Sequence, residues 1–130
     1  MLGANMSEAG ESLRILIADD ERIIANTLAL ILNASGYDAR AVYTGEKAVE
    51  EAGQLKPDVL ICDVILGGIS GIEVAIRITK TQPACRIILF SGQAATADLL
   101  ERAESEGYRF EILAKPVHPK VLLEYLARVK

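Results

Sequence analysis

The sequence has few residues of the kinds that build redox or histidine-centred sites. It contains no tryptophan, two cysteines and one histidine among 130 residues. Cys62 and Cys85 do not form a C-x-x-C pair and lie in or beside apolar segments, so we expect buried free thiols in a reducing cytoplasm. His118 is expected at the surface, at the start of a helix, rather than as a ligand or a phosphohistidine.

Long runs of one residue class are also missing. The net charge is −4 and no Lys/Arg-rich run predicts direct nucleic-acid binding. No apolar stretch approaches the roughly 18–20 residues of a membrane helix. Residues 1–12 lack basic residues and an apolar stretch, so they do not resemble a secretory signal and are expected to form a flexible arm. We therefore expect one cytoplasmic domain, residues 13–130, without direct nucleic-acid or membrane contacts.

The remainder of the chain alternates short apolar segments with amphipathic ones. Strands are predicted at 13–18, 38–43, 59–62, 86–90 and 110–114, and helices at 24–32, 44–55, 72–81, 96–106 and 119–128. Residues 38–43 are the least apolar, which is typical of an edge strand. Short connections and right-handed crossovers favour a doubly wound α/β fold with five parallel strands in the order 2-1-3-4-5.

Polar side chains follow four of the predicted strands. Asp19 and Asp20 follow the first strand, Asp63 the third, Ser91 the fourth and Lys115 the fifth. The carboxyl ends of parallel strands meet at one edge of the sheet, and strands 1 and 3 flank the switch point of this strand order. Three carboxylates, a hydroxyl and an ammonium are therefore expected to converge, which suits a divalent cation beside a transferable anion.

The three carboxylates indicate a metal. Because Asp19, Asp20 and Asp63 would repel one another, they need a cation, and carboxylate oxygens with water are the Mg²⁺ pattern. Asp19 and Asp20 alone could form a capped loop before a helix, and Lys115 alone could be a surface lysine. Pro116 favours an oriented Lys115, since it restricts the preceding residue and could hold a cis peptide.

Asp63 is the carboxylate best placed to react. It follows the central strand and precedes the glycine-rich loop 66–71, so we expect it to be accessible. Carboxylates can accept a phosphoryl group and form an aspartyl phosphate. The metal, Lys115 and the Ser91 hydroxyl would then position the group and neutralise its charge.

In these features residues 13–130 resemble the receiver domain of bacterial two-component response regulators. The resemblance is carried by Asp19-Asp20, Asp63, Ser91 and Lys115-Pro116, in this order on a five-fold βα chain. It implies a flavodoxin-like fold and a phosphorylation-dependent switch, not a turnover enzyme. It also implies a histidine kinase or phosphotransfer protein as the phosphoryl donor.

The resemblance also implies a role for each residue. Asp63 would be the phosphoacceptor, and Ser91 and Lys115 would contact the phosphoryl group. Mg²⁺ would be bound by Asp20, Asp63 and, through water, Asp19. The backbone carbonyl of Ile65 would be a further ligand.

The chain departs from the family pattern at three places. Leu66 and Gly67 stand where Met-Pro is frequent, so we expect a more mobile loop. Ile112 stands where the family usually has an aromatic residue, and the segment 107–114 is one residue longer. Because a β-branched side chain has few χ1 choices, we expect switching through backbone shifts in the 91–95 loop and the following helix.

Two other functions compete with this interpretation. The chain could be a degenerate receiver that acts only as an interaction module, or an Asp-nucleophile phosphatase. Such phosphatases typically need an acid two residues after the nucleophile, where this chain has Ile65. A P-loop NTPase is excluded because G-x-x-x-x-G-K-[S/T] is absent. We expect output through an unidentified protein, or through residues beyond this chain.

Overall fold

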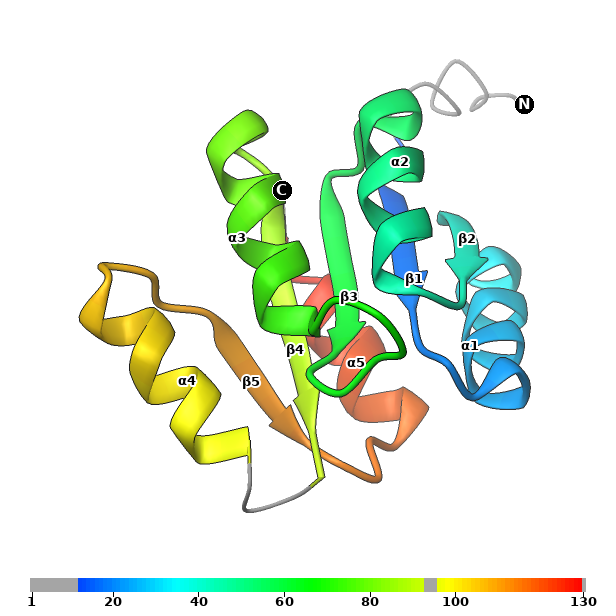
Figure 1. Ribbon diagram of the computed structural model, residues 1–130. Coiled ribbons are helices and arrows are strands. Elements are labelled where there is room, and N and C mark those ends of the chain that lie inside the picture. The colour runs from blue at the N-terminus through cyan, green and yellow to red at the C-terminus, as the bar shows by residue number, and fades with distance from the viewer. Residues whose placement is uncertain (1–11, 93–95, 130) are drawn as a thin grey trace.

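The computed structural model describes residues 12–92 and 96–129 (Figure 1). The predicted N-terminal arm, except Ser12, and part of the predicted 91–95 switching loop lie outside these residues. The strands are β1 (Arg14–Ala18), β2 (Asp38–Val42), β3 (Val59–Asp63), β4 (Arg86–Ser91) and β5 (Glu111–Ala114). The helices are α1 (Arg22–Ala34), α2 (Gly45–Leu55), α3 (Gly71–Thr81), α4 (Thr96–Ser105) and α5 (Pro119–Leu126).

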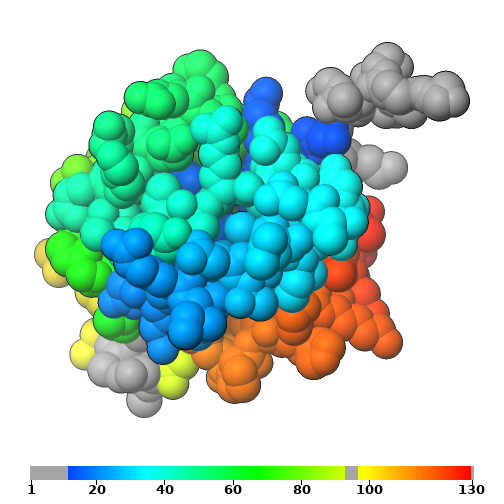
Figure 2. All heavy atoms as spheres, turned by 90° about the vertical axis from the view of Figure 1, so that its right-hand side faces the viewer, coloured from blue at the N-terminus to red at the C-terminus, as the bar shows by residue number. Residues whose placement is uncertain are grey.

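The five strands are parallel and lie in the order β2-β1-β3-β4-β5, which confirms the predicted fold class and topology. Helices α1 and α5 cover one face of the sheet, and α2, α3 and α4 cover the other (Figure 1). Figure 2 shows the side on which α1 lies, with α2 and α5 beside it. β3 is buried along its whole length because both faces of the sheet carry helices there.

Local signals place the ends of several helices as predicted. The Thr44 hydroxyl accepts a hydrogen bond from the Lys47 amide and begins α2. Pro119 occupies the first turn of α5, and the exposed His118 caps that helix, its Nδ1 accepting from the Lys120 amide. His118 is thus the predicted surface residue at a helix start.

Some element boundaries differ from the prediction. Asp63 and Ser91 are the last residues of β3 and β4, because Asp63 pairs with Phe90 and Ser91 with Ala114 across the sheet. Within α5, Val121 is 48% exposed, whereas Leu122 is fully buried. Successive residues of a helix point about 100° apart, so Val121 and Leu122 face different directions.

The two cysteines are free and buried, as predicted. Burial raises the pKa of both thiols, that of Cys85 to about 12, so they stay protonated near neutral pH. The Tyr108 and Phe110 rings stack with centroids 6.2 Å apart and pack against the core beneath α4. Among the helices that the structure describes, none is long and apolar enough to cross a membrane.

Candidate functional site

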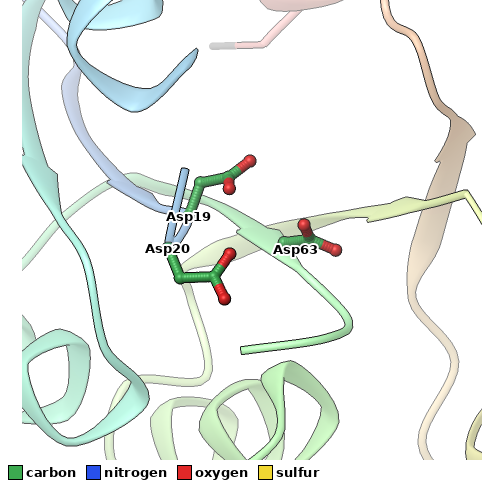
Figure 3. A group of neighbouring side chains, drawn as sticks. All are labelled: Asp19, Asp20 and Asp63. Atoms are coloured by element: carbon green, nitrogen blue, oxygen red, sulfur yellow. The ribbon is translucent and has the colours of Figure 1, made fainter. Parts of the chain in front are cut away.

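Three carboxylates meet at the carboxyl ends of β1 and β3 (Figure 3). One oxygen from each of Asp19, Asp20 and Asp63 lies within 4.8 Å of the others. Asp19 is 2% exposed, and its Oδ2 makes no hydrogen bond with any residue that the structure describes. Carboxylate oxygens are the ligands that hard divalent cations prefer, so this cluster could hold such a cation.

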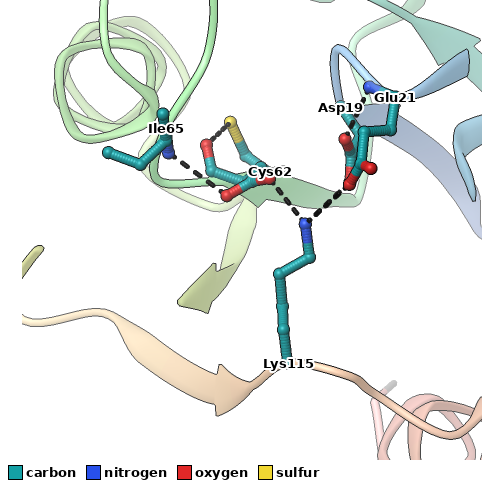
Figure 4. A network of polar contacts seen from close by, with 6 residues as sticks. Asp19, Glu21, Cys62, Ile65 and Lys115 are labelled. Atoms are coloured by element: carbon teal, nitrogen blue, oxygen red, sulfur yellow. Dashed lines mark hydrogen bonds and ion pairs between the residues drawn. The ribbon is translucent and has the colours of Figure 1, made fainter. Parts of the chain in front are cut away.

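Lys115 reaches the same cluster from the end of β5. Its Nζ donates to Asp63 Oδ2 at 2.7 Å and lies 3.5 Å from Asp19 Oδ2 and 3.6 Å from Glu21 Oε1. Figure 4 shows the lysine side chain extended toward Asp19 and Glu21. The Lys115–Pro116 peptide is cis. The structure therefore brings the predicted ammonium and the carboxylates together from opposite sides of β4.

The charges in this cluster depend on one another. Burial raises the pKa of Asp19, and the charge of Asp63 adds to this, against the opposing effects of the Glu21 amide and Lys115. For Lys115, burial alone would lower the pKa, but the hydrogen bond and the charge of Asp63, with the charges of Asp19 and Glu21, raise it. Lys115 therefore stays protonated and acts as the counterion of the acid cluster.

The expectation that Asp63 is accessible is wrong for this structure. Asp63 is 8% exposed, whereas Asp20 is exposed. The difference arises because Asp63 is the last residue of the fully buried β3, while Asp20 lies in the turn beyond β1. Contact with Lys115 takes the place of solvent at the Asp63 carboxylate.

Ser91 and Ile65 border the cluster. The Ser91 carbonyl accepts from the Lys115 amide at 3.0 Å, so the ends of β4 and β5 are tied together. The Ile65 amide donates to Asp63 Oδ1 at 3.2 Å, which places Ile65 beside the predicted acceptor. The predicted roles of the Ser91 hydroxyl and of the Ile65 carbonyl stay predictions.

Two further residues shape the site beyond those predicted. The Glu21 amide donates to Asp19 Oδ1 at 2.9 Å, and the Glu21 carboxylate is the third near Lys115. Gly71 begins α3 so close to Asp63 that a Cβ there would collide with the Asp63 carbonyl oxygen. The acidic run that follows β1 could have indicated Glu21 from the sequence. The close approach of Gly71 to Asp63 could not have been found in this way, because it is a tertiary contact.

A family model for the response regulator receiver domain matches residues 15–127. The chemotaxis protein CheY of Thermotoga maritima is 31% identical, over 89% of this chain and 96% of its own length. The DNA-binding response regulator MtrA of Mycobacterium tuberculosis is 30% identical over 90% of this chain but 49% of its own length. This chain thus spans about half the length of the MtrA relatives that it matches.

Solved structures agree with the sequence comparison. A CheY-like receiver domain from Methanospirillum hungatei superposes with a TM-score of 0.80 at 25% identity, covering 89% of this chain and 91% of that one. A putative response regulator from Chloroflexus aurantiacus gives a TM-score of 0.76 at 29% identity, covering 91% and 97%. By its sequence, its strand order and the residues at its sheet edge, the chain belongs to the response regulator receiver domain family of two-component signalling.

Proposed function

We propose that this chain is a phosphorylation-dependent signalling switch in which Asp63 accepts a phosphoryl group from a histidine kinase or phosphotransfer protein. One observation carries the proposal: the Asp63 carboxylate lies between an ammonium at 2.7 Å and two further carboxylates within 4.8 Å. That arrangement combines a nucleophile with groups that stabilise a transferred anion.

The transfer itself needs little covalent chemistry from the protein. An oxygen of Asp63 attacks the phosphorus, and the new O–P bond forms as the bond to the donor's imidazole nitrogen breaks. The electron pair of the broken bond leaves with the imidazole. Lys115, kept protonated by its acidic neighbours, moves its hydrogen bonds to the phosphoryl oxygens, and the Ser91 hydroxyl donates to them as well.

The residues present fit a Mg²⁺ ion. Asp20, Asp63 and the Ile65 carbonyl would hold it, with Asp19 acting through water. Support comes from the clustered carboxylate oxygens and from the buried Asp19 Oδ2. When bound, Mg²⁺ neutralises the acid cluster and the developing charge on the phosphoryl oxygens. The Glu21 amide holds Asp19 in place from its other oxygen.

The surface beside Lys115 suits the approach of a protein donor. A groove of about 490 Å³ adjoins the lysine between α1 and the start of α5, and it is lined by Glu21, Ile24, Leu28, Phe90, Gly92, Lys115, Pro116 and Val117. On α1 itself Ile23 is 82% and Leu30 72% exposed. We infer that the donor docks on α1, on the side seen in Figure 2, which brings its phosphorylated histidine to the sheet edge.

The output of the switch is assigned to contact with another protein. The relatives' names state different outputs, chemotaxis for CheY and DNA binding for MtrA. We propose that the described domain itself makes no nucleic-acid contact, since its sequence has no basic run and a net charge of −4. Ile65, at the position where Asp-nucleophile phosphatases need an acid, does not favour a turnover enzyme.

Labelling by a small phosphodonor tests the proposal. The chain is incubated with acetyl phosphate and Mg²⁺, and the modified residue is mapped by mass spectrometry. We expect one phosphoryl group on Asp63, none in Asp63→Asn, and normal labelling in Asp38→Asn, which changes an exposed aspartate at the start of β2. Full labelling of Asp63→Asn contradicts the proposal. Hydrolysis of a phosphate monoester such as p-nitrophenyl phosphate, with many turnovers per chain, would indicate a phosphatase instead.

A further inference from the structure

The loop between β3 and α3, residues 64–70, is closed at its two ends. The Val64 amide donates to the Phe90 carbonyl at 3.0 Å, and the Gly71 amide returns to the Val64 carbonyl at 2.8 Å. At Gly71 the chain passes against the Asp63 carbonyl too closely for any side chain. The loop therefore leaves and rejoins the fold at Asp63, and its shape decides what surrounds that carboxylate.

The middle of this loop rests on the first turn of α2. The Ile69 amide donates to Glu46 Oε2 at 3.3 Å. A Cβ on Gly68, whose φ is +81°, would collide with the Glu46 carboxylate. On the helix side, a Cβ on Gly45 would lie 2.7 Å from the Ile69 carbonyl oxygen. Two glycines thus allow the loop to approach α2 closely enough for Glu46 to hold it.

The exposed part of the loop lies between two apolar residues that contact the core, Leu66 and Ile69. Gly67 and Gly68 are exposed and have wide backbone freedom. Leu66 is buried in the core and anchors the first half of the loop. Between that anchor and Asp63 lies Ile65, whose amide donates to Asp63 Oδ1. Leu66 is the residue that connects Gly67 and Gly68 to Ile65, so a change in the loop path reaches Ile65 to the extent that it moves Leu66.

We propose that Glu46 is a positioning residue of the phosphorylation site: by holding Gly68 and Ile69 against α2, it keeps the Ile65 amide and carbonyl in place beside Asp63. Glu46 contacts neither Asp63 nor the transferred group. The inference rests on the proposed function, because it assigns the Ile65 carbonyl to the Mg²⁺ site. The competing role for Glu46 is purely structural, as an acidic residue in the first turn of α2 that favours the helix.

The first test uses the metal-free chain and does not depend on phosphorylation. Amide hydrogen exchange and chemical shifts are compared in wild type, Glu46→Ala and Glu46→Gln. Glu50→Ala is the matched control, since it removes the same charge from α2 at a residue paired only with Lys47 among the contacts found. We expect faster exchange at Ile69 and a shifted Ile65 amide in Glu46→Ala, and near wild-type behaviour in the other two. An unchanged Ile65 amide in Glu46→Ala overturns the proposal.

The second test separates metal affinity from the rate of transfer. In Glu46→Ala the Mg²⁺ concentration for half-maximal labelling should rise about tenfold, as for other residues that support metal ligands, while the rate at saturating Mg²⁺ stays within about twofold. Glu46→Gln should restore the wild-type midpoint, because it keeps an acceptor oxygen of the same reach. A lower saturating rate with an unchanged midpoint overturns the proposal. Absence of labelling in wild type would instead refute the proposed function. The hydrogen-exchange test would still show whether Glu46 positions the loop and Ile65.

A double variant guards against misfolding of α2. Gly68→Ala should raise the Mg²⁺ midpoint in wild type, both through its φ of +81° and because the added Cβ displaces the Glu46 carboxylate. In the Glu46→Ala background the collision is gone, so the added Cβ should have a smaller effect. Equal effects of Gly68→Ala in the two backgrounds would show that Glu46 does not act on this loop.

Discussion

Strands β3 and β5 lead to the two oppositely charged residues of the site, Asp63 and Lys115, but the two strands differ in burial. All five residues of β3 are buried, and the strand ends on Asp63. In β5 three of four residues are exposed, and the strand leads into Lys115. Asp63, the proposed phosphoacceptor, is therefore held by the core, whereas the Lys115 ammonium that contacts it is held by a thinly packed edge.

The helices beside these strands differ in the same way. α3 buries five residues against the sheet: Gly71, Ile72, Val74, Ala75 and Ile78. In α4, among the side chains that the structure describes, Ala103 is buried and Leu99 and Leu100 are partly buried. Regions with few buried apolar contacts open at lower free energy than the core. A phosphoryl group on Asp63 would thus alter the α4–β5 side of the molecule and leave the β1–β3 side in place.

The largest effect on labelling is expected from the loss of one of the three clustered aspartates. Asp20→Ala removes a predicted Mg²⁺ ligand that lies on the exposed side of the cluster, so labelling by acetyl phosphate should fall by about 100-fold or more. Titration calorimetry should show the loss of Mg²⁺ binding, and wild type in EDTA should behave alike. Labelling of wild type at full rate in EDTA would be incompatible with a metal-dependent site.

Removal of the cation should have the next largest effect. Lys115→Ala takes away the ammonium at 2.7 Å from Asp63, and labelling at saturating Mg²⁺ should slow by about 100-fold. The phosphorylated chain that does form should show little conformational change by NMR. Wild-type labelling together with a wild-type response would show that Lys115 is a structural counterion of the acid cluster and takes no part in transfer or switching.

The contrast in burial predicts a contrast in stability. Leu60 on β3 is fully buried, and Leu60→Ala should lower the free energy of unfolding by about 2–5 kcal/mol. Ile112 on β5 is 43% exposed, and Ile112→Ala should cost about 1 kcal/mol or less. Urea denaturation followed by far-UV circular dichroism measures both values. Equal losses of unfolding free energy would contradict the contrast between the buried β3 and the more exposed β5.

The smallest effect concerns the conformational response of α4 and β5, at the edge of the sheet. With beryllofluoride bound in place of the phosphoryl group, Ser91→Ala should blunt the NMR shift changes across α4 and β5, because the bias between two states must come from a contact that differs between them. Ile112→Val should leave these changes nearly intact, since it keeps a β-branched side chain of similar shape. A response that centres on Ile112 and survives in Ser91→Ala would show another mechanism.

Most of the fold could be predicted because its signals are local. The alternation of apolar and amphipathic segments, with Thr44 and Pro119 at helix starts, depends on neighbours in sequence. The strand order then places Asp19 and Asp63 at the carboxyl ends of the adjacent strands β1 and β3. Element ends were less predictable, because whether Asp63 and Ser91 belong to strands depends on their partners Phe90 and Ala114 across the sheet.

The sequence by itself determined the α/β class, the strand order and the set of polar residues at one sheet edge. These features depend on hydrophobic periodicity and on the direction of the chain, both of which follow from the local order of residues. Only the tertiary structure decided that Asp63 is buried beneath Lys115, and that Glu46 lies against the loop after it. These relations join residues that are 52 and 23 positions apart. Their distances and burial depend on how whole elements pack, and periodicity within one segment carries no information about that packing.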